Sequence, residues 1–512
     1  MIGEERAWWQ DGVIYQIYPR SFADSNGDGV GDLAGIIDRL DYLEWLGVNG
    51  IWLNPVTPSP NKDWGYDVSD YCDVHPELGD LETLDMLVAE AGRRGIRILL
   101  DIVPNHSSDQ HPWFEDSRSS RSAGHRDWYV WADGRDGGPP NNWQSVFGGP
   151  TWTFDEATGQ WYLHNFLPEQ PDLNWWTQGV WDAFDDILRF WFDRGIAGFR
   201  IDVAHGIVND RELRDDPPDP DAAWRLKPIY SMNRPEVHEI FRRWRTICEQ
   251  YDPARLLVGE THVLDPVVMA SYYGKGDELQ LAFNFAFVYA PFESERTRRV
   301  VEQTEAAIPS DGWPVWTLSN HDVIRFPTRW CGGDEAKIRC ALFVLLLLRG
   351  TAVLYYGDEL GLEQQDVPKE AELDLAGQRD GARTPMRWSN EPGHGFTREG
   401  VEPWLPFGSG PDVAAQRDDP GSILRLCRDL LALRRERPDL RQAPYASLPS
   451  PDGVWAWSRG DRYAAAVNLG EDEAVVELAG AILVGTNRER DGEQVRSGLC
   501  LGPSEGVLVD TT

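Results

Sequence analysis

The chain of 512 residues has only six cysteines, and they are scattered with no CxxC pair. This scatter argues against a disulfide framework and favours free thiols in a reducing compartment. The first residues are charged and contain no apolar signal core. The longest apolar run, near residues 341–348, is too short to cross a bilayer. We therefore expect a cytoplasmic protein without a membrane partner.

Lysine is also scarce, and acidic residues outnumber basic ones by 84 to 49, which gives a net charge of −35. A chain of this charge repels the phosphates of nucleic acids and of anionic membranes, so we expect neither as a partner. A neutral small molecule is indifferent to that charge. Internal repeats, low-complexity segments and flexible linkers are not evident in the sequence.

What the sequence does contain is a set of apolar segments that end in acidic or histidine side chains. In residues 198–203, Arg200 and Asp202 stand two apart, so in a strand they point to the same face. A buried guanidinium and carboxylate must pair, and pairing keeps the aspartate anionic, as a nucleophile requires. Taken alone, the pair fits a structural ion pair equally well. Three further segments end in the same way: 98–106, 256–260 and 316–322.

Four strands with such ends predict an α/β fold. In a (β/α)8 TIM barrel the carboxyl-terminal ends of the strands converge on one mouth, where catalytic groups lie. We expect one helix over residues 33–46 and the sixth strand at 281–287. Residues 104–176 lack sustained periodicity, and a loop of this length indicates a functional segment or a small domain. Short alternating runs after residue 441 predict a C-terminal antiparallel β-sandwich.

In their order along the chain, these four segments resemble the signature regions of the α-amylase family of glycoside hydrolases. The block Gln170-Pro171-Asp172-Leu173-Asn174 is similar to a marker of its oligo-1,6-glucosidase/α-glucosidase branch. The resemblance implies a catalytic barrel from residues 1–103 and 177–440, an inserted domain B from 104–176 after the third strand, and a C-terminal domain from 441–512.

The carboxylates fit the cleavage of a glycosidic bond, which needs one acid for the leaving oxygen and one carboxylate for the anomeric carbon. Asp202, paired with Arg200, is the expected nucleophile. Glu260 follows an apolar strand with no adjacent cation in the sequence, so we expect it to hold a proton and act as acid and then base. Asp322 is the third carboxylate, and near Glu260 it would raise the pKa of that residue.

The resemblance also implies further contacts with the glucose unit. In the family, the residue matching Asp322 grips the 2- and 3-hydroxyls, and Tyr66 and Asp67 match residues that close the innermost site. Asp101 and Asn105 are expected to orient Arg200 and its loop. The predicted substrate-binding residues are Tyr66, Asp67, His106, Phe147, Phe166, Arg200, His321 and Arg383.

Residues 24–32 place oxygen donors at every second position around glycines, which is the spacing of a calcium loop. The glutamate expected at the twelfth position is replaced by Gly35, so the loop is not a full EF-hand, and a plain turn with solvated acids fits as well. The resemblance favours a structural Ca²⁺ or Mg²⁺ and implies no organic cofactor. The implied ligands are Asp24, Asn26, Asp28, the Val30 carbonyl and Asp32.

The function implied is an exo-acting retaining α-glucosidase that releases glucose from short α-glucosides through a covalent β-glucosyl-aspartate. Val203 accompanies α-1,6 cleavage in several relatives, but Ala204 and His205 depart from their usual continuation, so α-1,4 and α-1,6 linkages both stay open. A transglucosylase, trehalose synthase or sucrose isomerase would use the same intermediate. A non-catalytic binding subunit would lack the carboxylates. A monomer and a homodimer are both compatible with the sequence.

Overall fold

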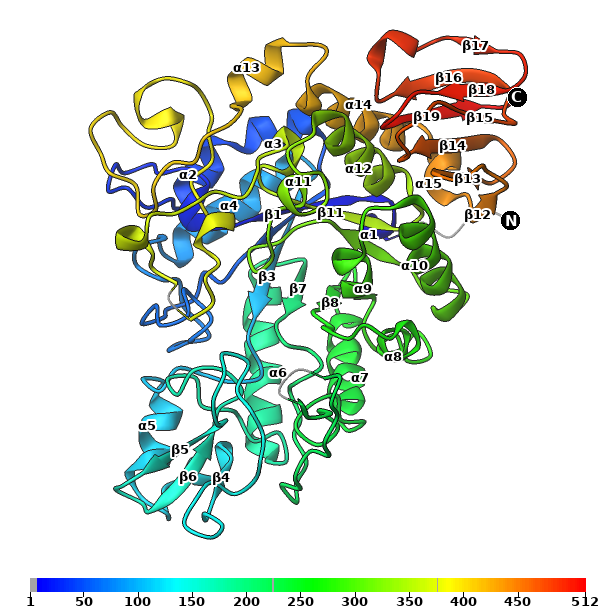
Figure 1. Cartoon of the computed structure of the whole chain (residues 1–512). Coiled ribbons are helices and arrows are strands. Elements are labelled where there is room, and N and C mark those ends of the chain that lie inside the picture. Colours follow the sequence, from blue (N-terminus) through cyan, green and yellow to red (C-terminus); the bar gives the residue numbers. More distant parts are fainter. Residues whose placement is uncertain (1–6, 223–224, 375) are drawn as a thin grey trace.

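The protein folds around one sheet of eight parallel strands, as the computed structural model of residues 7–222, 225–374 and 376–512 shows (Figure 1). The hydrogen-bonded order is β10-β11-β1-β2-β3-β7-β8-β9, so the last strand of the sheet in sequence, β11, pairs with the first, β1. The sheet has therefore curled into a nearly closed barrel, as predicted. The strands are β1 Val13–Ile17, β2 Gly50–Leu53, β3 Arg97–Ile102, β7 Gly198–Ile201, β8 Leu256–Gly259, β9 Leu281–Ala282, β10 Val315–Thr317 and β11 Thr351–Tyr355.

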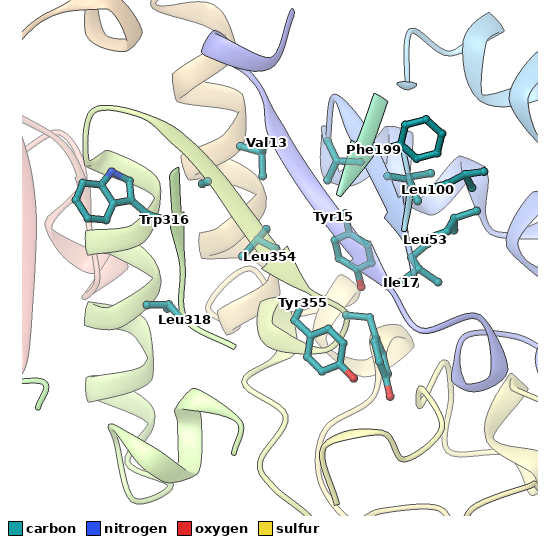
Figure 2. Close-up of a cluster of buried hydrophobic side chains, with 14 of the residues drawn as sticks. Val13, Tyr15, Ile17, Leu53, Leu100, Phe199, Trp316, Leu318, Leu354 and Tyr355 are labelled. Carbon is teal, nitrogen blue, oxygen red and sulfur yellow. The ribbon is translucent and has the colours of Figure 1, made fainter. Parts of the chain in front are cut away.

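Alternate residues of these strands enter two different cores, because successive side chains point to opposite faces. Tyr15, Leu53, Leu100, Phe199 and Leu354 belong to the larger core (Figure 2). That core also holds side chains from the covering helices. The intervening residues fill the inside of the barrel. They include Ile14, Trp52, Leu99, Val258 and Val353. This alternation decides which polar residues point inward at the strand ends.

Helices follow the strands along the chain and cover the barrel. Their apolar residues recur at helical spacing, as in α4, where Leu84, Leu87 and Ala91 are buried and Asp80 caps the N-terminus. In α12 every residue after Lys337 except Arg339 is buried, because the C-terminal strands β14 and β19 cover its other side. The covering helices are α2 Leu33–Asp38, α3 Leu40–Leu46, α4 Leu81–Arg93, α6 Gln178–Asp193, α7 Val237–Cys248, α8 Pro266–Ser271, α10 Ser294–Ala307, α12 Glu335–Leu347 and α14 Ile423–Glu436.

Two expected elements differ in the structure. The helix predicted over residues 33–46 is divided at Arg39, whose φ of −105° and ψ of 4° end α2 and begin α3. The sixth strand is confined to Leu281–Ala282, because Asn284 caps a helix, α9 Phe285–Tyr289, by accepting the N–H of Phe287. That helix brings aromatic residues to the mouth of the barrel.

Two further β units lie apart from the barrel sheet. Between β3 and α6, the strands β4 Trp131–Ala132, β5 Trp152–Asp155 and β6 Gln160–Leu163 form a small antiparallel sheet, which projects away from the barrel (cyan in Figure 1). At the C-terminus, six strands in the order β12-β13-β14-β19-β16-β17 face the pair β15-β18 across an apolar core (orange to red in Figure 1). These strands are β12 Tyr445–Leu448, β13 Val454–Arg459, β14 Tyr463–Asn468, β15 Ala474–Val476, β16 Gly480–Gly485, β17 Gln494–Val495, β18 Leu499–Leu501 and β19 Glu505–Asp510.

A largely irregular segment between β11 and α14 returns to the barrel mouth and carries Arg379 and Arg383. In the described part of the chain, every helix falls short of the length or the apolar character that a membrane span requires. The remaining short helices include α1 Trp8–Asp11, α5 Pro112–Ser119, α11 Phe326–Arg329, α13 Val413–Asp418, α15 Pro438–Gln442, η1 Pro19–Ser21, η2 Arg126–Trp128, η4 Asp358–Leu360, η5 Lys369–Ala371, η6 Asp380–Ala382, η7 Pro392–Gly395 and η8 Arg488–Arg490.

Candidate active site

A cavity of about 460 Å³ opens where the barrel strands end, and Asp202, Glu260 and Asp322 all line it. Asp202 follows β7 and Glu260 follows β8, which are neighbouring parallel strands. Their backbones continue the ladder beyond the strands, because Glu260 N–H donates to Ile201 O and Ala204 N–H to Glu260 O. Adjacent strands lie about 4.8 Å apart, so the two carboxylates start from neighbouring positions. The structure therefore brings the three carboxylates to one cavity.

One guanidinium holds both catalytic candidates. Arg200 Nη1 lies 2.7 Å from Asp202 Oδ1, and its Nη2 lies 2.7 Å from Glu260 Oε1. Asp101 Oδ1 is 2.8 Å from the same Nη1, so Asp101 holds Arg200 from its other side. The expectation that Glu260 has no adjacent cation is wrong, because the neighbouring strand supplies one.

Burial dominates the electrostatics of the nucleophile candidate. It raises the pKa of Asp202 well above its ordinary value; Glu260, Asp101 and Asp322 add to the increase, and Arg200 opposes it. The ion pair with Arg200 is thus the main interaction that favours the anionic form of Asp202. The sequence suggested that this pair would keep Asp202 anionic, but burial outweighs it and the pKa of Asp202 is raised.

The neutral His321 is fully buried and does not line the cavity, but it contacts residues that do. Gln16 Nε2 can only donate, so His321 Nδ1, 2.9 Å away, accepts, and Nε2 carries the proton. That Nε2 lies 2.5 Å from Tyr66 Oη and 3.1 Å from Asp322 Oδ2. Burial lowers the pKa of His321 well below its ordinary value, which keeps the ring neutral. Tyr66 donates in turn to Asp101 Oδ2 at 3.0 Å.

An ion-pair network that the sequence analysis missed lines the same cavity. Arg379 Nη2 lies 2.5 Å from Asp63 Oδ1, its Nη1 3.0 Å from Asp322 Oδ1, and its Nε 2.6 Å from Asp374 Oδ2. Burial acts to raise the pKa of Asp322, but His321, Arg379 and Arg383 outweigh it and lower that pKa. The side chain of Asp322 stays 29% exposed, so an anionic acceptor faces the cavity.

Four predicted substrate contacts, Asp67, Arg200, His321 and Arg383, do not line the cavity, and for two of them a neighbouring residue of like charge does. Asp67 is fully buried and does not line the cavity; its carboxylate accepts the N–H groups of Lys62 and Asp63 and the hydroxyl of Ser59. It therefore fixes the turn that presents Asp63.

Arg383 is also fully buried and does not line the cavity. It donates to His321 O at 2.9 Å and to Asp322 Oδ1 at 3.2 Å, so it supports these residues from behind. Asp63 and Arg379 occupy the cavity wall in place of Asp67 and Arg383.

The segment between β3 and α6 supplies a wall of rings. His106, Phe147 and Phe166 all line the cavity, with Phe166 5.1 Å from His106 and 5.9 Å from Phe147 between ring centres. Burial lowers the pKa of His106 to about 3, so this ring is neutral. Asn105 donates to Gly206 O at 2.9 Å and so holds the chain that follows Asp202.

Val203 links the nucleophile candidate to the acid candidate. Its φ of +44° lies in the left-handed region, which is strained for a β-branched residue. In this conformation its N–H donates to Glu260 Oε2 at 2.9 Å. The turn after β7 therefore orients both carboxylates.

The predicted metal loop is closed by its own hydrogen bonds. Asp24 accepts N–H groups of Gly27 and Gly29, Asp28 accepts that of Val30, and Asp32 caps α2. Within residues 7–222, 225–374 and 376–512, no group of three or more His, Cys, Asp or Glu side chains is arranged to hold a metal ion. A divalent cation in this loop would have to replace some of these hydrogen bonds. The metal site stays a prediction.

A larger cavity, of about 550 Å³, lies between the inserted segment and the chain after β7, and Asp127, Trp176 and Asp210 are among its lining residues. Asp210 is already paired with Arg214. None of the three carboxylates that Arg200 and Arg379 bring together lines this cavity. The smaller cavity is therefore the candidate active site.

Known proteins of similar sequence and structure include hydrolases and transfer enzymes. A family model described as the catalytic domain of alpha amylase matches residues 16–443. A probable alpha-glucosidase of Rhizobium meliloti is 40% identical, covering 93% of this chain and 92% of that protein. An oligo-1,6-glucosidase of Parageobacillus thermoglucosidasius is 36% identical, with 84% of each chain covered.

Two solved structures have nearly the same fold along the whole chain. The alpha-glucosyl transfer enzyme XgtA superposes with a TM-score of 0.93 at 38% identity, covering 99% of this chain and 100% of that one. The trehalulose synthase MutB from Pseudomonas mesoacidophila superposes with a TM-score of 0.92 at 32% identity, with the same coverage.

Proposed function

The chain belongs to the α-amylase family of glycoside hydrolases, and from this premise we propose that it is an exo-acting, retaining α-glucosidase that releases glucose from the non-reducing end of short α-glucosides. The observation that carries the proposal is the single guanidinium of Arg200, which contacts Asp202 and Glu260 at one cavity. Retaining enzymes hold their two carboxyls about 5 to 5.5 Å apart, and neighbouring positions on β7 and β8 suit that spacing.

The reaction proceeds in two displacements at the anomeric carbon. Asp202 attacks that carbon while Glu260 gives its proton to the leaving oxygen, and a β-glucosyl ester of Asp202 forms. Glu260, now a carboxylate, takes a proton from water, which attacks the same carbon and frees Asp202. The product keeps the α configuration because each displacement inverts it. Val203 N–H and Arg200 hold Glu260 in place through both steps.

The glucose hydroxyls would contact the polar end of the cavity, which Asp63, Asp322 and Arg379 form. Asp322 and Asp63 offer acceptors, and Arg379 offers donors between them. The neutral His321 faces the same carboxylate of Asp322. The ion pair of Asp63 and Arg379 limits the space beyond this glucose, which favours cleavage at the chain end.

The assay that tests the proposal follows maltose, isomaltose and their trimers by proton NMR. We expect free glucose as the first product, initially in the α form, and from trimers one glucose at a time. Initial β-glucose would contradict retention, and internal cleavage of longer α-glucans would contradict exo action. The ratio of rates on isomaltose and maltose gives the linkage preference.

A transfer reaction is the second candidate, because XgtA and MutB, by their names, act as a transfer enzyme and a trehalulose synthase. In that case a sugar hydroxyl replaces water in the second displacement. Near-stoichiometric glucose at high substrate concentration supports hydrolysis, whereas longer or isomerised sugars support transfer.

Replacing Arg379 by leucine should lower kcat/KM on isomaltose by roughly 10²- to 10⁴-fold, since breaking a buried ion pair costs about 3–5 kcal/mol. Asp63 and Asp322 would then face each other without the cation between them. The variant Arg379→Lys keeps the charge but cannot make paired contacts, so an intermediate loss is expected. Wild-type kinetics in Arg379→Leu would show that the network does not act on substrate.

We also propose that Asp24, Asn26, Asp28, the Val30 carbonyl and Asp32 hold a structural Ca²⁺, with Mg²⁺ as the alternative. An ion that binds only the folded state stabilises it by about 2.7 kcal/mol at a hundredfold excess over Kd. Adding Ca²⁺ to chelator-treated protein should therefore raise Tm in the wild type, but not in Asp24→Ala. Equal Tm values with Ca²⁺ and with chelator would show that hydrogen bonds alone close the loop.

A further inference from the structure

Four polar side chains, of which only Tyr66 lines the cavity, form a closed ring of hydrogen bonds. Gln16 Nε2 lies 2.9 Å from Asn54 Oδ1 and 2.9 Å from His321 Nδ1. Tyr66 Oη completes the ring, at 2.9 Å from Asn54 Nδ2 and 2.5 Å from His321 Nε2. All four residues are buried. We call them the hydrogen-bond ring.

Gln16 lies at a position in the barrel where its neighbours are apolar. It stands on β1 two residues after Ile14, so it points to the inside of the barrel, where Ile14, Trp52 and Val353 pack. Within the described residues its Oε1 is buried without a hydrogen-bond partner, which costs about 1–3 kcal/mol. A methionine of similar length would avoid this cost. The two N–H groups of the amide, and not its packing, therefore explain why a glutamine stands here.

Asp101 decides where the hydrogen of the Tyr66 hydroxyl lies. Its Oδ1 accepts from Arg200, and its Oδ2 accepts the indole N–H of Trp52 at 3.2 Å. Both of these partners can only donate, so Asp101 acts as an acceptor and also takes the Tyr66 hydroxyl hydrogen at 3.0 Å. The hydroxyl has no second hydrogen, so it can only accept from its other neighbours.

The amides of Asn54 and Gln16 take their orientation from this hydroxyl. Because Tyr66 accepts, Asn54 turns its NH₂ group to Tyr66 and its oxygen to Gln16. Gln16 must therefore present its NH₂ group, and the two hydrogens go to Asn54 Oδ1 and His321 Nδ1. A neutral histidine that accepts at Nδ1 carries its proton on Nε2. Since burial keeps His321 neutral, the hydrogen-bond ring selects one of its two tautomers.

The other tautomer would alter both halves of the site. With the proton on Nδ1, the lone pair of His321 Nε2 would face Asp322 Oδ2 at 3.1 Å, and two acceptors repel each other. The Tyr66 hydroxyl would turn from Asp101 to that nitrogen. Burial raises the pKa of Asp101 to about 7, and Arg200 and the Tyr66 hydroxyl lower it, so without this donor Asp101 would take up a proton more readily. A protonated Asp101 would hold Arg200 less strongly.

We propose that Gln16 and Asn54 are positioning residues that keep the proton of His321 on Nε2. The Tyr66 hydroxyl is thereby directed to Asp101. Neither Gln16 nor Asn54 lines the cavity, so they act on the glucoside only through the other members of the hydrogen-bond ring and the carboxylates beside them. The inference rests on the proposed function, because those carboxylates include the groups proposed to bind and cleave the glucoside.

The test replaces Gln16 by methionine, which has no donor, and labels the histidines with ¹⁵N. Nitrogen NMR distinguishes a protonated from an unprotonated ring nitrogen, and His321→Leu identifies the signals of His321 by their loss. We expect the wild type to carry the proton on Nε2 alone and Gln16→Met to populate both tautomers. The value of kcat/KM on isomaltose should fall about 10- to 100-fold, as is typical when a histidine loses the partner that fixes its tautomer.

Gln280→Met is the matched control. Gln280 is also buried and directly precedes β9, but its amide bonds only the backbone, accepting the N–H of Leu257 and donating to Arg255 O. This variant should change neither the spectrum of His321 nor kcat/KM. In His321→Leu, adding Gln16→Met should cause no further loss of activity, because the tautomer no longer exists, whereas a packing role would add a loss.

A wild-type spectrum with the proton of His321 on Nδ1 overturns the inference without any variant. An unchanged spectrum in Gln16→Met also overturns it, because a loss of activity would then come from packing. A changed spectrum with wild-type kinetics does so too. If the wild type cleaves neither isomaltose nor maltose, the proposed function is wrong, but the proton of His321 is still observed directly.

Discussion

Replacing Asp202 by alanine should abolish turnover of α-glucosides, with kcat falling by about 10⁵- to 10⁶-fold, as when other enzymes lose a nucleophile. The remaining carboxylate beside the anomeric carbon is Glu260, which must protonate the leaving oxygen and cannot attack from the opposite face. The measurement is the initial rate on isomaltose and on α-glucosyl fluoride. Retention of wild-type rates would end the assignment of Asp202.

Adding azide, a small anion, should give the Asp202→Ala variant a detectable product. In Asp202→Ala, azide should enter the space beside Arg200 and attack α-glucosyl fluoride from the face that Asp202 occupied, so the product is β-glucosyl azide. Asp101→Ala is the comparison variant, since it also removes a carboxylate from Arg200 but leaves Asp202 in place. It should lower the rate without forming a β-azide. Formation of α-glucosyl azide by Asp202→Ala would place the nucleophile elsewhere.

The barrel could be predicted because its signals are local. Each strand is a short apolar run, and its polar end follows directly in the sequence, as Asp202 follows β7 and Glu260 follows β8. Two-residue spacing placed Arg200 and Asp202 on one face, and the 2.7 Å contact agrees. The family-like order of these segments then implied that they meet, and they line one cavity.

The contact of Arg200 with Glu260 was not predictable from spacing, because it depends on how β7 and β8 are registered. Arg200 pairs with Val258, so the position level with Asp202 is Glu260. That register is a property of the whole barrel, in which strand tilt and stagger are linked. No pattern within either strand indicates it.

The sequence also could not show which of two neighbouring residues of like charge lines the cavity. Asp63 and Asp67 stand in one turn, and the sequence analysis selected Asp67. The turn passes through Trp64 at a φ of +50°, which directs Asp63 to the cavity and leaves Asp67 to bind backbone N–H groups.

The sequence also could not decide which of Arg379 and Arg383 faces the cavity. That choice depends on the backbone just before Arg379, where Gln378 has a φ of +54°. Left-handed φ values at non-glycine residues have no reliable sequence signal. Arg379 could have been recognised only through its partners Asp63 and Asp322, which lie far away along the chain.

Replacing Glu260 by glutamine should produce a loss that depends on the leaving group. The amide keeps the size of the side chain but cannot give a proton to the leaving oxygen. General acid catalysis contributes about 10²- to 10⁴-fold, so kcat/KM on isomaltose should fall by that amount. With α-glucosyl fluoride the fall should be much smaller, because fluoride departs with little help from an acid. The ratio of the two losses is the measurement.

Azide also distinguishes a chemical role of Glu260 from a structural one. In Glu260→Ala the glucosyl ester of Asp202 still forms from the fluoride, and the space left by Glu260 lies on the leaving-group side. Azide should attack from there and give α-glucosyl azide, the opposite anomer to that from Asp202→Ala. Equal losses on fluoride and isomaltose, with no azide product, would mean that Glu260 only holds Arg200 and Val203 in place. Opposite anomers from the two variants require the two carboxylates to stand on opposite faces of one sugar ring.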